Sequence, residues 1–233
     1  MACILNIETS THVCSAALSS DGVVLYEKVS YEGQAHAALL GVYVEEALQV
    51  MQQKGMKLDA VAVSSGPGSY TGLRIGVSVA KGLCFGLEIP LISIHTLDLL
   101  ASTAIRKHAE EDSLYCPMLD ARRMEVYAAI YDAELNQVRA AGADIVTDET
   151  YAAWLNRGKV CFFGNGSAKC SQVIVSPNAT FLEEIDPLAV NMIPLSEKAF
   201  AEKRFEDVAY FEPFYLKEFQ ATVAKNKVLG VHK

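Results

Sequence analysis

Glycine and hydroxyl residues are concentrated between Gly66 and Gly72, directly after an apolar run and directly before a helix-forming stretch. Free amides and the helix dipole at such a corner favour an anion, so phosphate binding is the first chemistry to consider. The spacing does not match a P-loop, because no lysine follows the glycines, and Pro67 removes an amide that a pyrophosphate would need. We therefore interpret the run as a rigid corner that aims a helix, in which Ser69 or Thr71 caps the first free amides.

Two other groups of residues could contact a nucleotide or a phosphate. Glu8, Thr9 and Ser10 follow the first apolar run of the chain. They either contact a nucleotide or satisfy backbone donors in a tight turn, and we favour the turn. Gly164 and Gly166 follow a later apolar run, where they form either a second phosphate loop or a plain turn.

The segment from Asp120 to Glu125 contains two adjacent arginines between two predicted strands. As structure, Asp120 makes an Asx-type turn and Arg122 or Arg123 pairs with Glu125. As function, the two arginines hold a phosphate or the carboxylate of a partner beside a cleft. The sequence leaves these two interpretations equally open.

A metal site is not expected. Two histidines one helical turn apart would place both imidazoles on one face, but one turn beyond His36 stand Leu39 and Leu40. We expect His36 to be exposed or satisfied locally in the first turn of a helix. No serine, cysteine or lysine has a partner at a spacing that indicates an activated nucleophile, so no catalytic residue is predicted.

These residues lie at the ends of predicted strands. Three β-type runs joined by turns predict an antiparallel meander, and the helices and strands that then alternate follow the ribonuclease-H-like order. A weaker second copy follows, so we expect an α/β fold with mixed sheets, an N-terminal lobe over 1–100 that carries the partner-binding helices, and a degenerate C-terminal lobe over 101–233. The predicted strands are 3–7, 13–18, 23–29, 60–64, 91–94, 115–119, 125–132, 138–146 and 160–163; the helices are 35–53, 73–83, 97–107, 149–156 and 188–204. Residues 225–233 are expected to fray.

The helix after the glycine corner is apolar on two sides. Leu73, Val77, Ala80 and Cys84 form one stripe and Ile75, Val79 and Leu83 a second, so one stripe packs on the sheet and the other on a partner. The helix over 35–53 shows the same pattern, and sequence does not say which stripe faces the partner. Because the small Ala80 permits a close helix-to-helix contact, we assign its stripe to the partner. The expected interface is Leu39, Tyr43, Leu73, Arg74, Val77, Ala80, Lys81 and Cys84.

Composition limits the classes of function. The chain has 233 residues, of which 51% are hydrophobic, so it can bury a substantial core. A formal net charge of −8 lacks the basic field that nucleic-acid binding needs, so any contact with RNA would depend on a partner. The six cysteines form no Cys-x-x-Cys pair, and no segment reaches the apolar length of a membrane span. We therefore expect a cytoplasmic protein with reduced thiols and no membrane contact.

Three segments resemble the bacterial TsaB (YeaZ-like) proteins, and the resemblance extends over nearly the whole chain, to Lys217. The segments are Ile4-Leu-Asn-Ile-Glu-Thr-Ser-Thr11, Ser65-Gly-Pro-Gly-Ser-Tyr-Thr-Gly-Leu-Arg-Ile-Gly76 and Leu119-Asp-Ala-Arg-Arg-Met-Glu-Val-Tyr127. The resemblance implies an actin-like fold of two ribonuclease-H-like subdomains. The chain departs from the actin-like ATPases at one position. These ATPases usually have an aspartate that organises the magnesium of a nucleotide, and this chain has Glu8 there.

The resemblance further implies a non-catalytic subunit that binds a homologous TsaD-type enzyme together with a TsaE-type ATPase, in the transfer of threonylcarbamoyl to an adenosine of tRNA. Such a subunit forms a homodimer when alone, contacts tRNA only through the complex, and has no cofactor of its own, since the complex uses the ATP. The alternative is an independent enzyme, a nucleotide-dependent transferase or a peptidase, that uses the inter-lobe cleft.

Overall fold

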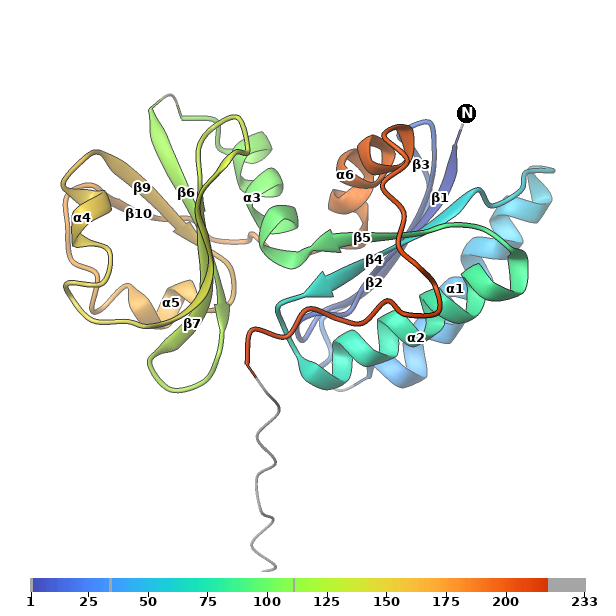
Figure 1. Ribbon diagram of the computed structural model, residues 1–233, viewed down its shortest axis with the longest axis horizontal. Coiled ribbons are helices and arrows are strands. Elements are labelled where there is room, and N and C mark those ends of the chain that lie inside the picture. Colours follow the sequence, from blue (N-terminus) through green and yellow to red (C-terminus); the bar gives the residue numbers. More distant parts are fainter. Residues whose placement is uncertain (1, 34, 111, 218–233) are drawn as a thin grey trace, which may run out of the picture.

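The computed structural model describes residues 2–33, 35–110 and 112–217. Two lobes lie side by side, each built on one five-stranded mixed sheet (Figure 1). The tail predicted over 225–233 lies outside the described residues.

The first sheet has the order β3-β2-β1-β4-β5. Its first three strands form the predicted antiparallel meander, and β4 and β5 are parallel to β1 and β4 respectively. Alternate residues of β1 point to opposite faces, so that Leu5 faces α1 and α2 while Ile4 faces α6. The elements are β1 (Cys3–Glu8), β2 (Cys14–Ser20), β3 (Val23–Ser30), α1 (His36–Gln53), β4 (Ala60–Gly66), α2 (Tyr70–Leu87) and β5 (Leu91–His95).

The second sheet repeats this topology in the order β8-β7-β6-β9-β10, with the same pattern of antiparallel and parallel pairs. The duplication that the order of elements predicts is therefore present. The three-stranded antiparallel part is complete, whereas the helices and the last strand are short. The elements are α3 (Thr96–Lys107), β6 (Ser113–Asp120), β7 (Glu125–Tyr131), β8 (Gln137–Ile145), α4 (Ala152–Leu155), β9 (Lys159–Phe163), α5 (Ser167–Cys170), β10 (Ala179–Phe181) and α6 (Ala189–Ala201).

The expected division at residue 100 does not match the packing of the two lobes. It falls inside α3, whose Leu100 packs with Tyr115 and Phe163 of the second sheet. The last described helix, α6, belongs to the first lobe, because Met192 and Ala199 pack against apolar residues of the first sheet (Figure 1). The reason is physical: the face of the first sheet opposite α1 and α2 is also apolar, and α6 covers it.

The predicted and observed elements differ at the helix after the corner and at the short elements of the second lobe. The helix after the corner begins at Tyr70 rather than at residue 73, because Ser69 and not Thr71 caps it. The short α5 and β10 were not predicted as elements, since neither is long enough to show a periodic pattern. The six cysteines are all free and buried, as predicted for core thiols.

Candidate functional site

The Glu8-Thr9-Ser10 turn and the glycine corner, which are separate in sequence, lie against each other. The amide of Ser69 donates to the carbonyl of Ser10 at 2.6 Å, and Thr9 Oγ1 donates to the carbonyl of Gly72 at 2.8 Å. Ser69 Oγ in turn accepts from the amide of Gly72 at 3.2 Å. In a nucleotide-binding corner such amides would face a phosphate, but here they donate hydrogen bonds to acceptors within the chain.

Three glycines permit this contact. A Cβ atom at Gly68 would lie 2.3 Å from the carbonyl oxygen of Ser10, and one at Gly72 would lie 2.1 Å from that of Thr9. A Cβ at Gly76 would lie 2.3 Å from Thr9 Oγ1. The glycines therefore serve the close approach of the corner to the end of β1, which supports the interpretation as a rigid corner.

Glu8 is fully buried beneath the corner. Its carboxylate accepts a hydrogen bond from the amide of Ser10 at 2.5 Å and a second one from the hydroxyl of Ser64. Burial raises the pKa of Glu8 to about 7, although hydrogen bonds from Ser10 and Thr9 lower it in part. Both carboxylate oxygens have partners within the chain, as expected for a residue that stabilises a tight turn.

The second lobe repeats the arrangement on a smaller scale. A Cβ at Gly164, whose φ is +92°, would lie 2.6 Å from the carbonyl oxygen of Met118, and one at Gly166 would meet the end of β6 at 2.8 Å. The side chain of Asn165 accepts a hydrogen bond from the amide of Asp120 at 2.9 Å. This corner, too, is packed against the end of the neighbouring parallel strand.

The arginine pair forms the tip of the β6–β7 hairpin. Asp120 accepts a hydrogen bond from the amide of Arg122 at 3.0 Å, so the expected Asx-type turn is present. Both arginines are exposed and have left-handed backbone angles, with φ of 69° at Arg122 and 48° at Arg123. The expected pairing of an arginine with Glu125 is wrong, because Glu125 pairs with Lys217, which approaches from the C-terminal segment.

His36 lies in the first turn of α1, where its Nε2 is 3.1 Å from the carbonyl oxygen of Val13. Its side chain is buried and its partner lies 23 residues away in the sequence, so the expectation that His36 is exposed or satisfied within its own helical turn is wrong. Among residues 2–33, 35–110 and 112–217, no three His, Cys, Asp or Glu residues are grouped closely enough to hold a metal ion.

The partner stripe assigned on α2 is wrong. Leu73, Val77, Ala80 and Cys84 are all buried, and the last three pack in the core of the first lobe with residues of β1 and β4. The small Ala80 permits a close contact, as expected, but the contact is with the sheet of its own lobe. These four residues are therefore unavailable to a partner in the folded chain.

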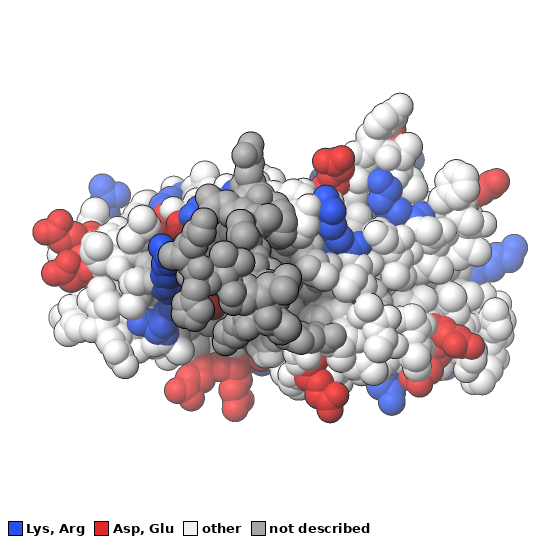
Figure 2. All heavy atoms as spheres, turned by 90° about the horizontal axis from the view of Figure 1, so that it is seen from below, with Lys and Arg blue, Asp and Glu red and all other residues white. Residues whose placement is uncertain are grey.

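The opposite stripes of α1 and α2 remain half-exposed, and they form what we call the α1–α2 face. Nearby, Phe85 exposes 82% of its surface at the end of α2. Viewed from below, the first lobe shows few charged residues on this side, scattered among uncharged ones (Figure 2). The face consists of Leu39, Val42 and Tyr43 from α1 and Ile75, Val79 and Leu83 from α2.

The polar edge of α2, which carries Arg74 and Lys81, contacts the C-terminal segment, and the sequence did not predict this contact. Lys81 Nζ donates to the carbonyl oxygens of Ala209 and Phe211 at 3.2 and 2.9 Å. Arg74 Nε donates to the hydroxyl of Tyr215 at 3.4 Å. Sequence reasoning missed this role because residues 206–217 show no periodic pattern; their only signal was that the family resemblance extends to Lys217.

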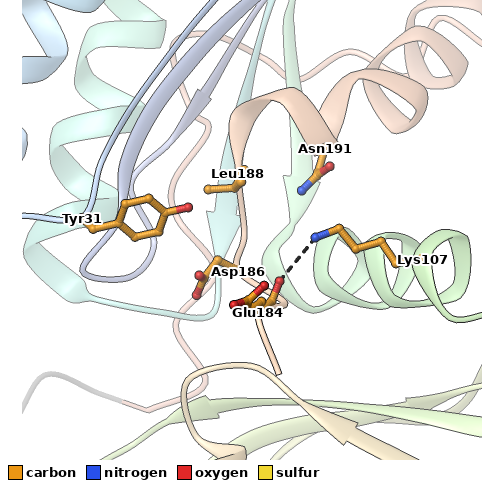
Figure 3. Close-up of a pocket in the computed structure, with 6 residues that line it drawn as sticks. All are labelled: Tyr31, Lys107, Glu184, Asp186, Leu188 and Asn191. Carbon is orange, nitrogen blue, oxygen red and sulfur yellow. Dashed lines mark hydrogen bonds between the residues drawn. The ribbon is translucent and has the colours of Figure 1, made fainter. Parts of the chain in front are cut away.

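A separate surface hollow lies between the end of α3 and the segment that leads to α6 (Figure 3). Lys107 Nζ donates to the carbonyl oxygen of Glu184 at 3.4 Å across it. None of the residues predicted to contact a ligand lines this hollow. Its walls are Tyr31, Lys107, Glu184, Asp186, Leu188 and Asn191.

No described helix has the length and apolar character that crossing a membrane requires.

Comparison with known proteins gives consistent results. A family model described as TsaD, tRNA N6-adenosine threonylcarbamoyltransferase, matches residues 27–225. The tRNA threonylcarbamoyladenosine biosynthesis protein TsaB of Escherichia coli is 29% identical over 97% of this chain and 98% of its own length. The protein of the same name from Bacillus subtilis is 32% identical over 94% and 95%. The solved structure of YeaZ from Pseudomonas aeruginosa matches 93% of this chain and all of its own, at 26% identity and a TM-score of 0.77. The YeaZ likeness and the paired mixed sheets confirm the two-lobed actin-like fold.

Proposed function

The chain belongs to the TsaB family of tRNA threonylcarbamoyladenosine biosynthesis proteins, within the wider sequence family that the TsaD model describes, and we propose that it acts there as a non-catalytic scaffold subunit. In this proposal its α1–α2 face binds a homologous TsaD-type enzyme. The enzyme, and not this chain, transfers threonylcarbamoyl to the adenosine of tRNA.

The α1–α2 face is the observation that carries the proposal. Val42 exposes 47% of its surface, and the apolar residues around it are only half-buried against the core of the lobe. Covering them with a second apolar surface would be favourable by about 25 cal/mol for each Å² removed from water. The half-buried residues of both helices pack against the same core, so one partner surface can cover residues from both.

The filled corners favour a scaffold over the alternative of an independent transferase or peptidase. A nucleotide phosphate at the first corner would have to break the hydrogen bond between Ser69 and Ser10. It would also have to occupy the space that the side chain of Thr9 fills beside Gly76. The carboxylate of Glu8, at the position of a magnesium-organising acid, is engaged by Ser10 and Ser64. These contacts are compatible with a cleft that has lost an ancestral ligand site.

The remaining partners follow from the same proposal. A TsaE-type ATPase joins the enzyme and the scaffold in the cytoplasm, and the ATP is used by the complex. The net charge of −8 favours contact with tRNA only through the complex. In the absence of the enzyme, two copies of this chain cover each other's α1–α2 faces as a homodimer.

The experiment is a binding assay between the full chain and the TsaD-type enzyme of the same organism. Leu83→Glu and Val79→Glu each place a charge on the α1–α2 face, where the parent side chains are only half-buried. We expect both variants to keep the melting temperature of the parent, to sediment as monomers, and to bind the enzyme at least about a hundredfold more weakly, because the complex would bury an unpaired charge.

Val175→Glu is the matched control, because Val175 exposes 85% of its surface and lies in the other lobe. It adds the same charge without touching the proposed face, so binding should be unchanged. Undiminished binding by Leu83→Glu, with a normal melting temperature, would contradict the scaffold interface.

A further inference from the structure

The C-terminal segment 206–217, which we call the strap, crosses the first lobe and reaches the second. In Figure 1 it leaves the region of α6, runs along α2 and turns toward β7. Its first residue pairs with the free edge of the first sheet: the amide of Glu206 donates to the carbonyl of Leu91 at 2.9 Å, and the Glu206 carboxylate accepts from Ser93 Oγ at 2.5 Å. The strap therefore begins with an antiparallel bridge to the edge strand β5.

The middle of the strap is anchored on α2. Val208 and Phe211 are half-buried against the core of the first lobe, and Lys81 donates to two carbonyl oxygens of this part of the strap. The ammonium group of Lys81 is well suited to this, since it offers three donors to backbone acceptors. This anchor combines apolar burial with charge-assisted hydrogen bonds.

The strap next covers the glycine corner. The amide of Phe214 donates to the carbonyl of Ser65 at 2.7 Å, and its ring packs edge-on against His95 with 5.4 Å between the ring centroids. The carbonyl oxygen of Phe214 would lie 2.5 Å from a Cβ at Gly66, where φ is +111°. Only a glycine at position 66 admits this approach. The ring of Tyr215 then packs against that of Tyr70 at a tilt, with 5.0 Å between the ring centroids.

The end of the strap contacts the second lobe through an ion pair. Lys217 pairs with Glu125 at the start of β7, in the hairpin that carries Arg122 and Arg123. The side chain of Lys217 is 47% exposed and that of Glu125 is 19% exposed, so solvent weakens the attraction between them. The strap is thus held firmly on the first lobe and lightly on the second.

We propose that the strap is a releasable latch between the lobes. Residues 206–211 stay anchored on β5 and α2, while residues 214–217 detach as a unit. Their detachment uncovers the Ser65–Gly66 corner and frees the β6–β7 hairpin to move relative to the first lobe. The exposure of this end supports the proposal, because Phe214 exposes 40% of its surface and the side chain of Lys217 47%, and a weakly buried end opens first in local unfolding. The same segment touches α2, the corner and the second lobe, so it is placed to transmit a change at one of them to the others.

Amide hydrogen exchange on the full chain tests the latch, independently of any partner protein. Phe214→Ala removes the ring over His95, and we expect exchange to rise about tenfold or more in peptides that cover 64–69 and 121–127. Exchange in peptides from β1 and β9 and the melting temperature should stay as in the parent. Tyr210→Ala is the control, because Tyr210 lies in the same segment but exposes 85% of its surface. This substitution should leave the exchange rates of the 64–69 and 121–127 peptides unchanged.

Charge reversal tests the attachment to the second lobe. Lys217→Glu should raise exchange over 121–127 by up to about fivefold, and combining it with Glu125→Lys should restore the parent rate. If Phe214→Ala changes only the strap, or accelerates exchange evenly across both lobes, the strap is a passive part of the first lobe and the latch is excluded. Failure of the double reversal to restore the parent rate would exclude the Lys217–Glu125 attachment.

Discussion

The hydroxyl of Thr9 donates a hydrogen bond to the carbonyl of Gly72 at 2.8 Å and so joins the end of β1 to the first turn of α2. The side chain occupies the space that a Cβ at Gly76 would need, 2.3 Å from Thr9 Oγ1. A corner whose composition is typical of phosphate binding is therefore closed by a side chain of the neighbouring strand. The helix that follows is held in a fixed direction relative to the sheet.

The glycines of α2 should differ in their tolerance of a methyl group. In Gly72→Ala the new Cβ would lie 2.1 Å from the backbone oxygen of Thr9, which cannot move without shifting β1, so we expect a loss of about 3 kcal/mol in the free energy of unfolding. Gly82→Ala, on the same helix, meets nothing within 4 Å and should gain about 0.5–1 kcal/mol from helix propensity. Urea denaturation of both variants measures the difference. Equal changes in the free energy of unfolding would show that the contact with the backbone oxygen of Thr9 does not restrict the side chain at position 72.

The two stripes of α2 should respond oppositely to a charge. Val77→Glu and Ala80→Glu place an unpaired charge in the core, which costs several kcal/mol against a total stability of about 5–15, so both should unfold the first lobe. Ile75→Glu, on the α1–α2 face, should stay folded. Circular dichroism and thermal melting distinguish these outcomes. A folded Ala80→Glu variant would contradict the placement of this stripe against the sheet.

Stability should depend on the protonation of Glu8. Burial raises its pKa from the ordinary value of 4.5 to about 7 in the folded chain, so folding favours the protonated form. The contribution is fully present below pH 4.5 and is lost as the pH rises through 7, by an amount on the order of 3 kcal/mol. Glu8→Gln removes this titration, so its free energy of unfolding should vary less than that of the parent between pH 5 and 8. Parallel pH profiles of the two proteins, measured by urea denaturation, would contradict the raised pKa.

The isolated chain should hydrolyse ATP no faster than buffer. The corner amide of Ser69 and the carboxylate of Glu8 already have partners within the chain, so neither is available to a nucleotide or its magnesium. A phosphate-release assay on the purified protein, with and without magnesium, measures this. Sustained turnover that disappears in Glu8→Ala would overturn the non-catalytic assignment.

Local sequence patterns determined much of this protein. The alternation of apolar residues and turns predicted the strands of both sheets except the three-residue β10, because each pattern depends only on neighbours a few residues apart. The glycine corner could be recognised as a rigid structural element, since Pro67 and the missing lysine excluded the known phosphate motifs. The two apolar stripes of α2 were also visible in the sequence.

Tertiary structure alone decided which stripe of α2 is buried. Helical periodicity is the same for Ala80 and Val79, and only the position of the sheet distinguishes them. The same holds for α6, which closes the apolar face of a sheet formed more than ninety residues earlier in the chain. Lys81 and Arg74 reach the strap across 128 and 141 residues. Such contacts depend on how distant segments meet in space, and no local pattern of residue types encodes that meeting.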